Sequence, residues 1–273
     1  MVKELILHLG DCKTGSTALQ MALAYRTVQI TGHSLYYPPG ANHNTLARAV
    51  STNKRRVTRE AQLERANRAF GDMAALIDAS DADFGIISAE LFEFSDPKLL
   101  AQMLNTHFPN HTQTMRMIVY IRPHADRLLS WFAEVSKLGG WQGDMDGFLT
   151  RLRSRGTLDY MPRLTRWRDL FGDRLIVRPF VRDNLKNGDI VTDVLHIIGR
   201  GAPVVVPATH PQNTSLSLQD LVMLRVILNR IGAQGSKQAT ACKVLGREMG
   251  RLLSPLATEQ STKLRLHRQL AQQ

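Results

Sequence analysis

Apolar positions along the chain fall into two patterns: short continuous runs, and longer segments in which they recur every three or four residues. The short runs predict buried strands over 5–9, 84–88, 115–121 and 174–180. The longer segments predict helices over 16–29, 59–79, 97–107, 123–137, 146–153, 162–171, 189–199, 217–231 and 237–253. Glycine and paired prolines predict a loop over 30–40. Strands that alternate with helices are typical of an α/β fold with a mostly parallel central sheet flanked by helices.

We expect a single domain over 1–273, with an α/β core over 1–200 and a helical C-terminal extension over 201–273. Ligands of such sheets bind beyond the carboxyl ends of the strands. The residues that directly follow each predicted strand are therefore the first candidates for function.

The segment that follows the first strand is rich in phosphate-binding residue types. It contains Gly10, Asp11, Cys12, Lys13, Thr14, Gly15, Ser16 and Thr17. A glycine-bounded turn between a strand and a helix directs backbone N–H groups at an anion, and the helix dipole favours negative charge there. A Walker A loop needs G-x-x-x-x-G-K-[ST], but Ser16 takes the place of its lysine, which has moved back to Lys13. This difference disfavours an ordinary ATP- or GTP-splitting site.

The pattern His8-x-Gly10-x-x-Lys13-Thr14-Gly15-Ser16-Thr17 resembles the 5′-phosphosulfate loop of sulfotransferases that use 3′-phosphoadenosine 5′-phosphosulfate (PAPS). The family usually has Pro or His before the lysine, where this chain has Cys12. The resemblance implies a P-loop-like three-layer sandwich in which residues 10 and 12–17 bind the cofactor. It also implies transfer of a sulfonyl group from PAPS to a hydroxyl or amine, without a metal and with release of the 3′,5′-bisphosphate PAP. Lys13 would stabilise negative charge on the departing phosphate.

Arg122 directly follows the third predicted strand, and Ser130 lies eight positions later. A guanidinium can bind a phosphate with two parallel hydrogen bonds, and a hydroxyl can add a third donor. This spacing resembles the 3′-phosphate site of the same family, which implies that Arg122 and Ser130 bind the 3′-phosphate. The family more often has Asp or Asn and then Pro after the arginine, where this chain has Pro123 and His124.

A carboxylate, Glu90, follows the second predicted strand. It is well placed as a general base that removes the proton of the acceptor as the acceptor attacks sulfur. His43 is its rival, and His33 is a weaker one; both lie in the region after the first helix. Glu90 and His43 therefore join Lys13 as candidate catalytic residues.

The formal net charge is +11, from 35 Lys and Arg against 24 Asp and Glu, which favours anionic partners. Two cysteines are too few for a disulfide framework, no Cys/His cluster predicts a metal site, and no apolar run approaches the roughly 20 residues of a membrane span. With no signal peptide in view, we expect a cytoplasmic, bacterial enzyme whose acceptor is a carbohydrate, a glycolipid or another hydroxylated molecule.

Two other classes of function stay open from the residues alone. A P-loop kinase or nucleotide hydrolase with a degenerate loop would depend on Mg²⁺ and would need an Asp at a strand end. A non-catalytic nucleic-acid-binding protein would need a recognisable module or an aromatic and basic platform, and the sequence has neither.

Overall fold

The computed structural model describes residues 1–52 and 58–207. The helices expected over 217–231 and 237–253 lie outside these residues, so the C-terminal extension stays a prediction. Tertiary contacts divide the described chain into two compact units: unit 1 holds Met1–Arg122 and residues 160–207, and unit 2 holds Pro123–Asp159.

The centre of unit 1 is a five-stranded sheet in the order β3-β4-β1-β5-β6, in which every neighbouring pair is parallel. Its strands are β1 (Glu4–His8), β3 (Leu35–Tyr36), β4 (Phe84–Ser88), β5 (Arg116–Ile121) and β6 (Leu175–Pro179). A separate antiparallel pair joins β2 (Gln29–Ile30) to β7 (Val204–Val205). The parallel central sheet confirms the α/β fold class expected from the sequence.

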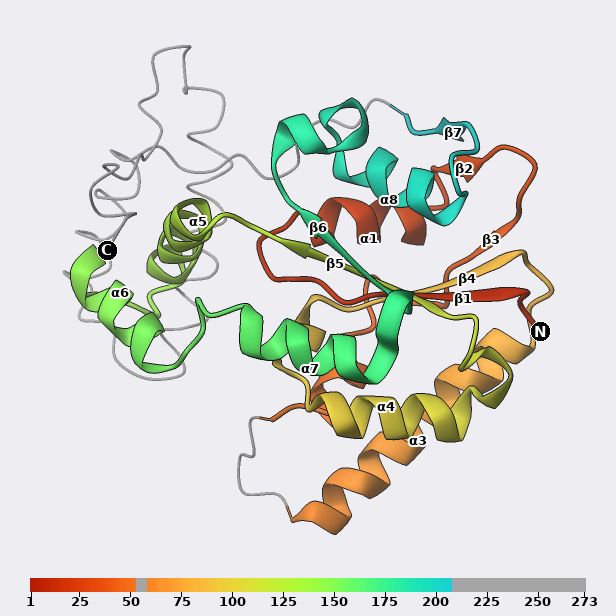
Figure 1. Cartoon of the computed structure of the whole chain (residues 1–273), viewed down its shortest axis with the longest axis horizontal. Coiled ribbons are helices and arrows are strands. Elements are labelled where there is room, and N and C mark those ends of the chain that lie inside the picture. The colour runs from red at the N-terminus through yellow and green to blue at the C-terminus, as the bar shows by residue number, and fades with distance from the viewer. Residues whose placement is uncertain (53–57, 208–273) are drawn as a thin grey trace. The chain divides into compact units, whose positions relative to one another are not determined.

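Helices cover both faces of the sheet in unit 1 (Figure 1). One face carries α1 (Ser16–Ala24) and α8 (Ile190–Ile198); the other carries α3 (Arg59–Asp78), α4 (Pro97–His107) and α7 (Met161–Phe171). Also in unit 1 are α2 (Asn44–Ala49) and five short 3₁₀ helices, η1 (Glu90–Phe94), η2 (Pro109–His111), η3 (Gly172–Arg174), η4 (Arg182–Asn184) and η5 (Lys186–Gly188). The arrangement is a three-layer α/β sandwich.

Alternate residues of β1 divide the core between the two faces, because successive side chains of a strand point in opposite directions. Leu5 and Leu7 pack in the cluster that includes α3, α4 and α7, whereas Ile6 packs in the cluster that includes α1 and α8. All five residues of β1 are buried, which agrees with a central strand. β1 is thus held by packing from both sides, and the loop that follows it starts from a rigid point.

The chain leaves β1 toward one side of the sheet and leaves β4 toward the other. The first connection reaches β3 at one edge, and the second crosses to β5 on the far side of β1. In open α/β sheets, the point where connections diverge in this way, at the carboxyl ends of the strands, is the usual ligand site.

Unit 2 contains α5 (His124–Lys137) and α6 (Met145–Ser154). The two helices pack through a small apolar cluster of their own, formed by Leu128, Phe132, Phe148 and Leu152. The rings of Phe132 and Phe148 meet edge to face with their centroids 5.6 Å apart.

Two local expectations are wrong. The first helix ends at Ala24 rather than near residue 29, because Arg26 adopts a left-handed conformation with φ of 54°. The N–H groups of Arg26 and Thr27 then bond back to the carbonyls of Leu23 and Ala22, which is a Schellman motif. The expected loop over 30–40 also contains β3, a two-residue strand at the edge of the sheet.

Candidate functional site

The loop between β1 and α1 lies at the carboxyl end of the central strand. Its start is fixed to β5, because Asp11 N–H donates to the carbonyl of Tyr120 at 3.0 Å and Tyr120 N–H donates to the carbonyl of Gly10 at 2.8 Å. Its end is fixed by close packing, since a Cβ on Gly15 would lie 3.0 Å from Ile190 of α8 and 3.3 Å from the ring of Phe180. The loop is therefore held at both ends by elements distant in sequence.

Four consecutive backbone N–H groups of the loop, those of residues 14–17, donate to no other group in the described residues. They belong to Thr14, to Gly15 at the N-cap of α1 and to the first two residues of that helix. No side chain caps this end of the helix. Uncapped N–H groups at a helix start carry a partial positive charge and are well suited to an anion.

Hydroxyl groups inside the loop shape it. Thr14 Oγ1 and Ser16 Oγ both donate to the carbonyl of Asp11, at 2.5 and 3.2 Å, and both side chains are buried. The Ser16 hydroxyl, expected to contact phosphate, thus bonds within the loop. Thr17 is exposed, and Lys13 is half-buried with φ of 67°.

Asp11 is fully buried and forms a two-pronged ion pair with Arg163 of α7. Nη1 and Nη2 of Arg163 donate to Oδ1 and Oδ2 of Asp11 at 2.6 and 2.7 Å. The Arg163 side chain is 13% exposed, and its guanidinium lies 5.7 Å from the ring centroid of Trp167. The sequence indicated Asp11 only as a member of the loop, with no role of its own, and did not indicate Arg163. The two are 152 positions apart, so no local pattern indicates the pair.

Two glutamates of η1 lie beside the loop in different ways. The buried carboxylate of Glu93 accepts the N–H of Cys12 at 3.0 Å. Glu90 touches the loop through its backbone: its carbonyl accepts the Cys12 thiol at 3.8 Å and lies against Gly10. Sequence reasoning missed Glu93, although it stands three residues after Glu90, one turn of a 3₁₀ helix.

Arg122, the residue that follows β5, is also joined to the loop. Its Nη1 donates to the carbonyl of Lys13 at 3.0 Å, and its guanidinium lies 5.6 Å from the ring centroid of Phe180. Its own carbonyl accepts the hydroxyl of Tyr160 at 2.6 Å. Unit 1 therefore brings Arg122 and the loop together. Ser130 belongs to α5 of unit 2, so its place beside Arg122 stays a prediction.

His43 has both ring nitrogens engaged with backbone groups. Nδ1 accepts the N–H of Ser88 at 3.0 Å, so the proton is assigned to Nε2, which lies 3.3 Å from the carbonyl of Pro38. The histidine thereby joins the segment after β3 to the end of β4. Burial lowers its pKa. His33, the weaker rival, is exposed and lies against the ring of Phe84.

A second buried histidine, His8, ends β1. Its Nδ1 lies 2.8 Å from Ser88 Oγ, which also accepts Gln20 Nε2 at 3.1 Å. Its Nε2 is buried and has no partner among the described residues. Burial lowers the pKa of His8 to about 4, so the ring is neutral at pH 7.

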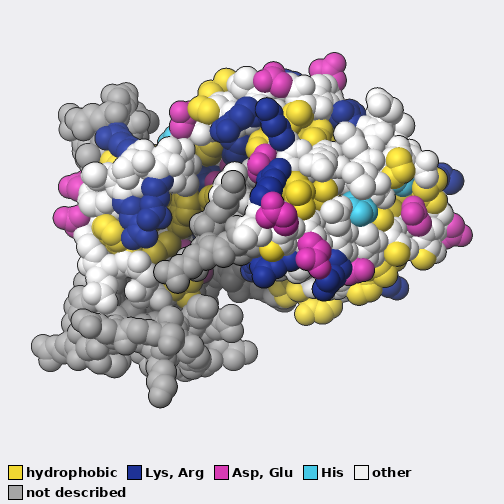
Figure 2. Space-filling view, turned by 90° about the horizontal axis from the view of Figure 1, so that it is seen from below, with side chains coloured by type: hydrophobic (Ala, Val, Ile, Leu, Met, Phe, Trp, Pro, Cys, Tyr) yellow, Lys and Arg dark blue, Asp and Glu magenta, His cyan; other side chains and the backbone are white. Residues whose placement is uncertain are grey.

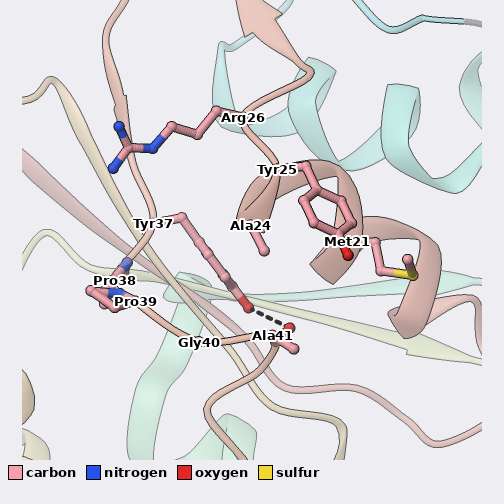
Figure 3. Close-up of a pocket in the computed structure, with 9 residues that line it drawn as sticks. All are labelled: Met21, Ala24, Tyr25, Arg26, Tyr37, Pro38, Pro39, Gly40 and Ala41. Carbon is pink, nitrogen blue, oxygen red and sulfur yellow. Dashed lines mark hydrogen bonds between the residues drawn. The ribbon is translucent and has the colours of Figure 1, made fainter.

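A cavity of about 330 Å³ lies away from the loop, beside the last turns of α1 (Figure 3). Tyr25 and Arg26 contribute from the helix end, and Tyr37 with the segment through Ala41 contributes from the chain after β3. The Tyr37 hydroxyl points along that segment and donates to the carbonyl of Ala41 at 3.4 Å. No residue of the loop lines this cavity.

Charged side chains of both signs share the surface that Figure 2 shows, where Lys and Arg lie among Asp and Glu. In the described part of the chain, no group of three His, Cys, Asp or Glu side chains could hold a metal ion. None of the helices described within 1–52 and 58–207 is long and apolar enough to cross a membrane.

Comparison with known proteins finds a similar fold among solved structures. The sequence matches no protein-family model and no curated protein. The solved structure of a sulfotransferase from Alicyclobacillus acidocaldarius is similar, with 15% sequence identity, 90% of this chain and 96% of that chain covered, and a TM-score of 0.49. A likeness of this degree assigns no activity to the chain, so its function rests on the site itself.

The first prediction concerns the contact between Gly10 and Glu90. Gly10→Ala should destabilise the protein more than Gly32→Ala, as measured by urea denaturation. Both glycines have positive φ, but a Cβ on Gly10 would lie 2.7 Å from the carbonyl of Glu90, whereas a Cβ on Gly32 would meet nothing within 4 Å. We expect the unfavourable conformation to lower the free energy of unfolding by roughly 1 kcal/mol in both variants. The clash should lower it by about 1–3 kcal/mol more in Gly10→Ala alone. Equal losses for the two variants would contradict the close approach.

The second prediction concerns the pH dependence of stability. The pKa of His8 is lowered in the folded protein, so the neutral ring contributes stability that is present above pH 6.5 and is lost as the pH falls toward 4. At pH 5 this loss amounts to about 2 kcal/mol from His8. Urea denaturation at pH 7.5 and pH 5 should therefore show a steeper fall for the wild type than for His8→Asn. Parallel pH profiles would exclude a neutral buried His8.

Proposed function

We propose that the protein is a sulfotransferase that moves a sulfonyl group from PAPS to a hydroxyl or amine of an acceptor and releases PAP. The proposal is supported chiefly by the loop over residues 10–17, where four uncapped N–H groups lie next to Lys13 at the carboxyl end of β1 and Arg122 bonds the loop at the carbonyl of Lys13. Such a set of donors suits a dianionic phosphate group.

The loop would hold the 5′-phosphosulfate. The N–H groups of Thr14, Gly15, Ser16 and Thr17 would donate to its oxygens, and the hydroxyls of Thr14 and Ser16 would keep the loop in shape through the carbonyl of Asp11. Lys13 would stabilise the negative charge that develops on the bridging oxygen as the sulfur–oxygen bond breaks. These groups supply positive charge without a metal ion, so the scheme needs none.

Arg122 would bind the 3′-phosphate, with Ser130 of α5 as a second donor. Its Nη1 donates to the carbonyl of Lys13 at 3.0 Å, which holds the guanidinium beside the loop. The same side chain would thus link the two phosphate sites of the nucleotide. An arginine that binds the 3′-phosphate would make the site selective for PAPS over ATP, because ATP lacks that phosphate.

Glu90 is our preferred general base. It follows β4 at the same sheet edge as the loop, and its backbone lies against Gly10. Its carboxylate would take the proton of the acceptor as the acceptor oxygen or nitrogen attacks sulfur. His43 is a poorer candidate, since its two ring nitrogens already bond backbone groups of Ser88 and Pro38. We further propose that the acceptor is a carbohydrate or glycolipid and that the protein acts in the bacterial cytoplasm.

The third prediction tests the donor nucleotide. Isothermal calorimetry should find that the wild type binds PAP without Mg²⁺ and more tightly than ATP. Arg122→Ala should weaken PAP binding by tenfold or more, because a charge-assisted contact to phosphate contributes roughly 1.5–3 kcal/mol. Arg26→Ala, which removes an exposed arginine at the far end of α1, is the matched control and should bind PAP as the wild type does. Binding of ATP with Mg²⁺ but not of PAP would instead indicate a kinase.

The fourth prediction separates the two candidate bases. Glu90→Gln should lower the rate of ³⁵S transfer from labelled PAPS to a panel of mono- and disaccharides by about 10²–10⁴, with PAP affinity and melting temperature unchanged. His43→Gln should instead lower the melting temperature, since it breaks bonds between the segment after β3 and β4. Full transfer activity in Glu90→Gln would reject Glu90 as the base.

A further inference from the structure

Several of the bonds that hold the loop over residues 10–17 involve Asp11, whose side chain is a carboxylate. Its N–H is bonded to β5, its carbonyl accepts the hydroxyls of Thr14 and Ser16, and its buried carboxylate faces Arg163. The residue therefore stands between the strand and the four uncapped N–H groups of residues 14–17.

A buried carboxylate at this position opposes the binding of an anion. Like charges repel strongly where water is excluded, and Asp11 has no exposed surface. A second carboxylate, that of Glu93, already accepts the N–H of Cys12 in the same loop. An uncompensated Asp11 would leave the loop facing two negative charges while it has to bind a dianion.

Arg163 compensates this charge with a geometry that also fixes the side chain. Its two terminal nitrogens lie 2.6 and 2.7 Å from the two carboxylate oxygens, an arrangement that only an arginine can make. Packing limits the movement of the arginine, because its side chain is 13% exposed and lies over Trp167. α7 thereby supplies a fixed positive charge to a loop at the end of β1.

We propose that Arg163 is a positioning residue for nucleotide binding: by neutralising and orienting Asp11, it keeps the loop over residues 10–17 receptive to a phosphate dianion. Arg163 acts through Asp11 and does not itself contact the nucleotide. This inference rests on the proposed function, since it takes PAP as the ligand of the loop.

A double-mutant cycle on Asp11 and Arg163 tests the proposal, with PAP affinity measured by calorimetry. Arg163→Met removes the positive charge that pairs with Asp11 and should weaken PAP binding at least tenfold. Asp11→Asn with Arg163→Met removes both charges and should restore PAP affinity to within about threefold of the wild type. Arg166→Met is the matched control and should leave PAP affinity unchanged. Arg166 is an exposed arginine of the same helix, and its Nε donates to the carbonyl of Pro162.

Rescue by the second substitution is the readout that a purely structural role would not produce. A structural ion pair would lower the melting temperature of Arg163→Met, and the double variant would then bind PAP no better than the single one. That result, or wild-type affinity in Arg163→Met, would overturn the proposal. If Arg163→Met does not fold, Arg163→Gln takes its place: it removes the charge but keeps an N–H donor, and it should weaken PAP binding at least tenfold, with recovery to within about threefold of the wild type when Asp11→Asn is added. A wild type that binds no PAP would instead reject the proposed function.

Discussion

The ion pair between Asp11 and Arg163 is the interaction on which the geometry of the candidate site depends. It joins the first residues after the central strand to α7, more than 150 positions later in the chain. Removing one partner of a buried pair usually costs about 3–5 kcal/mol, because the other charge is left without compensation. The same Asp11 orders the loop through its carbonyl, so the charge and the shape of the loop are coupled in a single residue.

Other contacts extend this arrangement to the neighbouring strands. Arg122 binds the carbonyl of Lys13 from the end of β5, and Glu93 accepts the N–H of Cys12 from the residues after β4. His43 and Ser88 tie the chain after β3 to β4. Together with Arg163 of α7 and the packing of Ile190 of α8 against Gly15, the contacts from Arg122 and Glu93 hold the loop, which explains how a segment without regular structure can present its N–H groups in a fixed direction.

The parts of this site that are local in sequence could be predicted, and those that depend on distant contacts could not. The apolar runs of β1, β4 and β5 indicated buried strands, and a parallel sheet then brings Gly10–Thr17, Glu90 and Arg122 to one edge. Arg163 carried no signal, because it is one of several arginines on an ordinary amphipathic helix. The bonds at both ring nitrogens of His43 could not be predicted either, since no sequence pattern distinguishes a loop histidine that acts as a general base from one that bonds backbone groups. The end of α1 at Ala24 depends on the left-handed Arg26, a conformation that sequence composition does not favour.

A crystal structure of the protein with PAP would show whether the loop binds the nucleotide, because it locates both phosphates relative to the loop. We expect the 5′-phosphate to lie within hydrogen-bonding distance of the N–H groups of residues 14–17 and of Lys13, with the 3′-phosphate bound by Arg122 and Ser130. A nucleotide bound elsewhere, with the loop left without a ligand, would contradict this expectation.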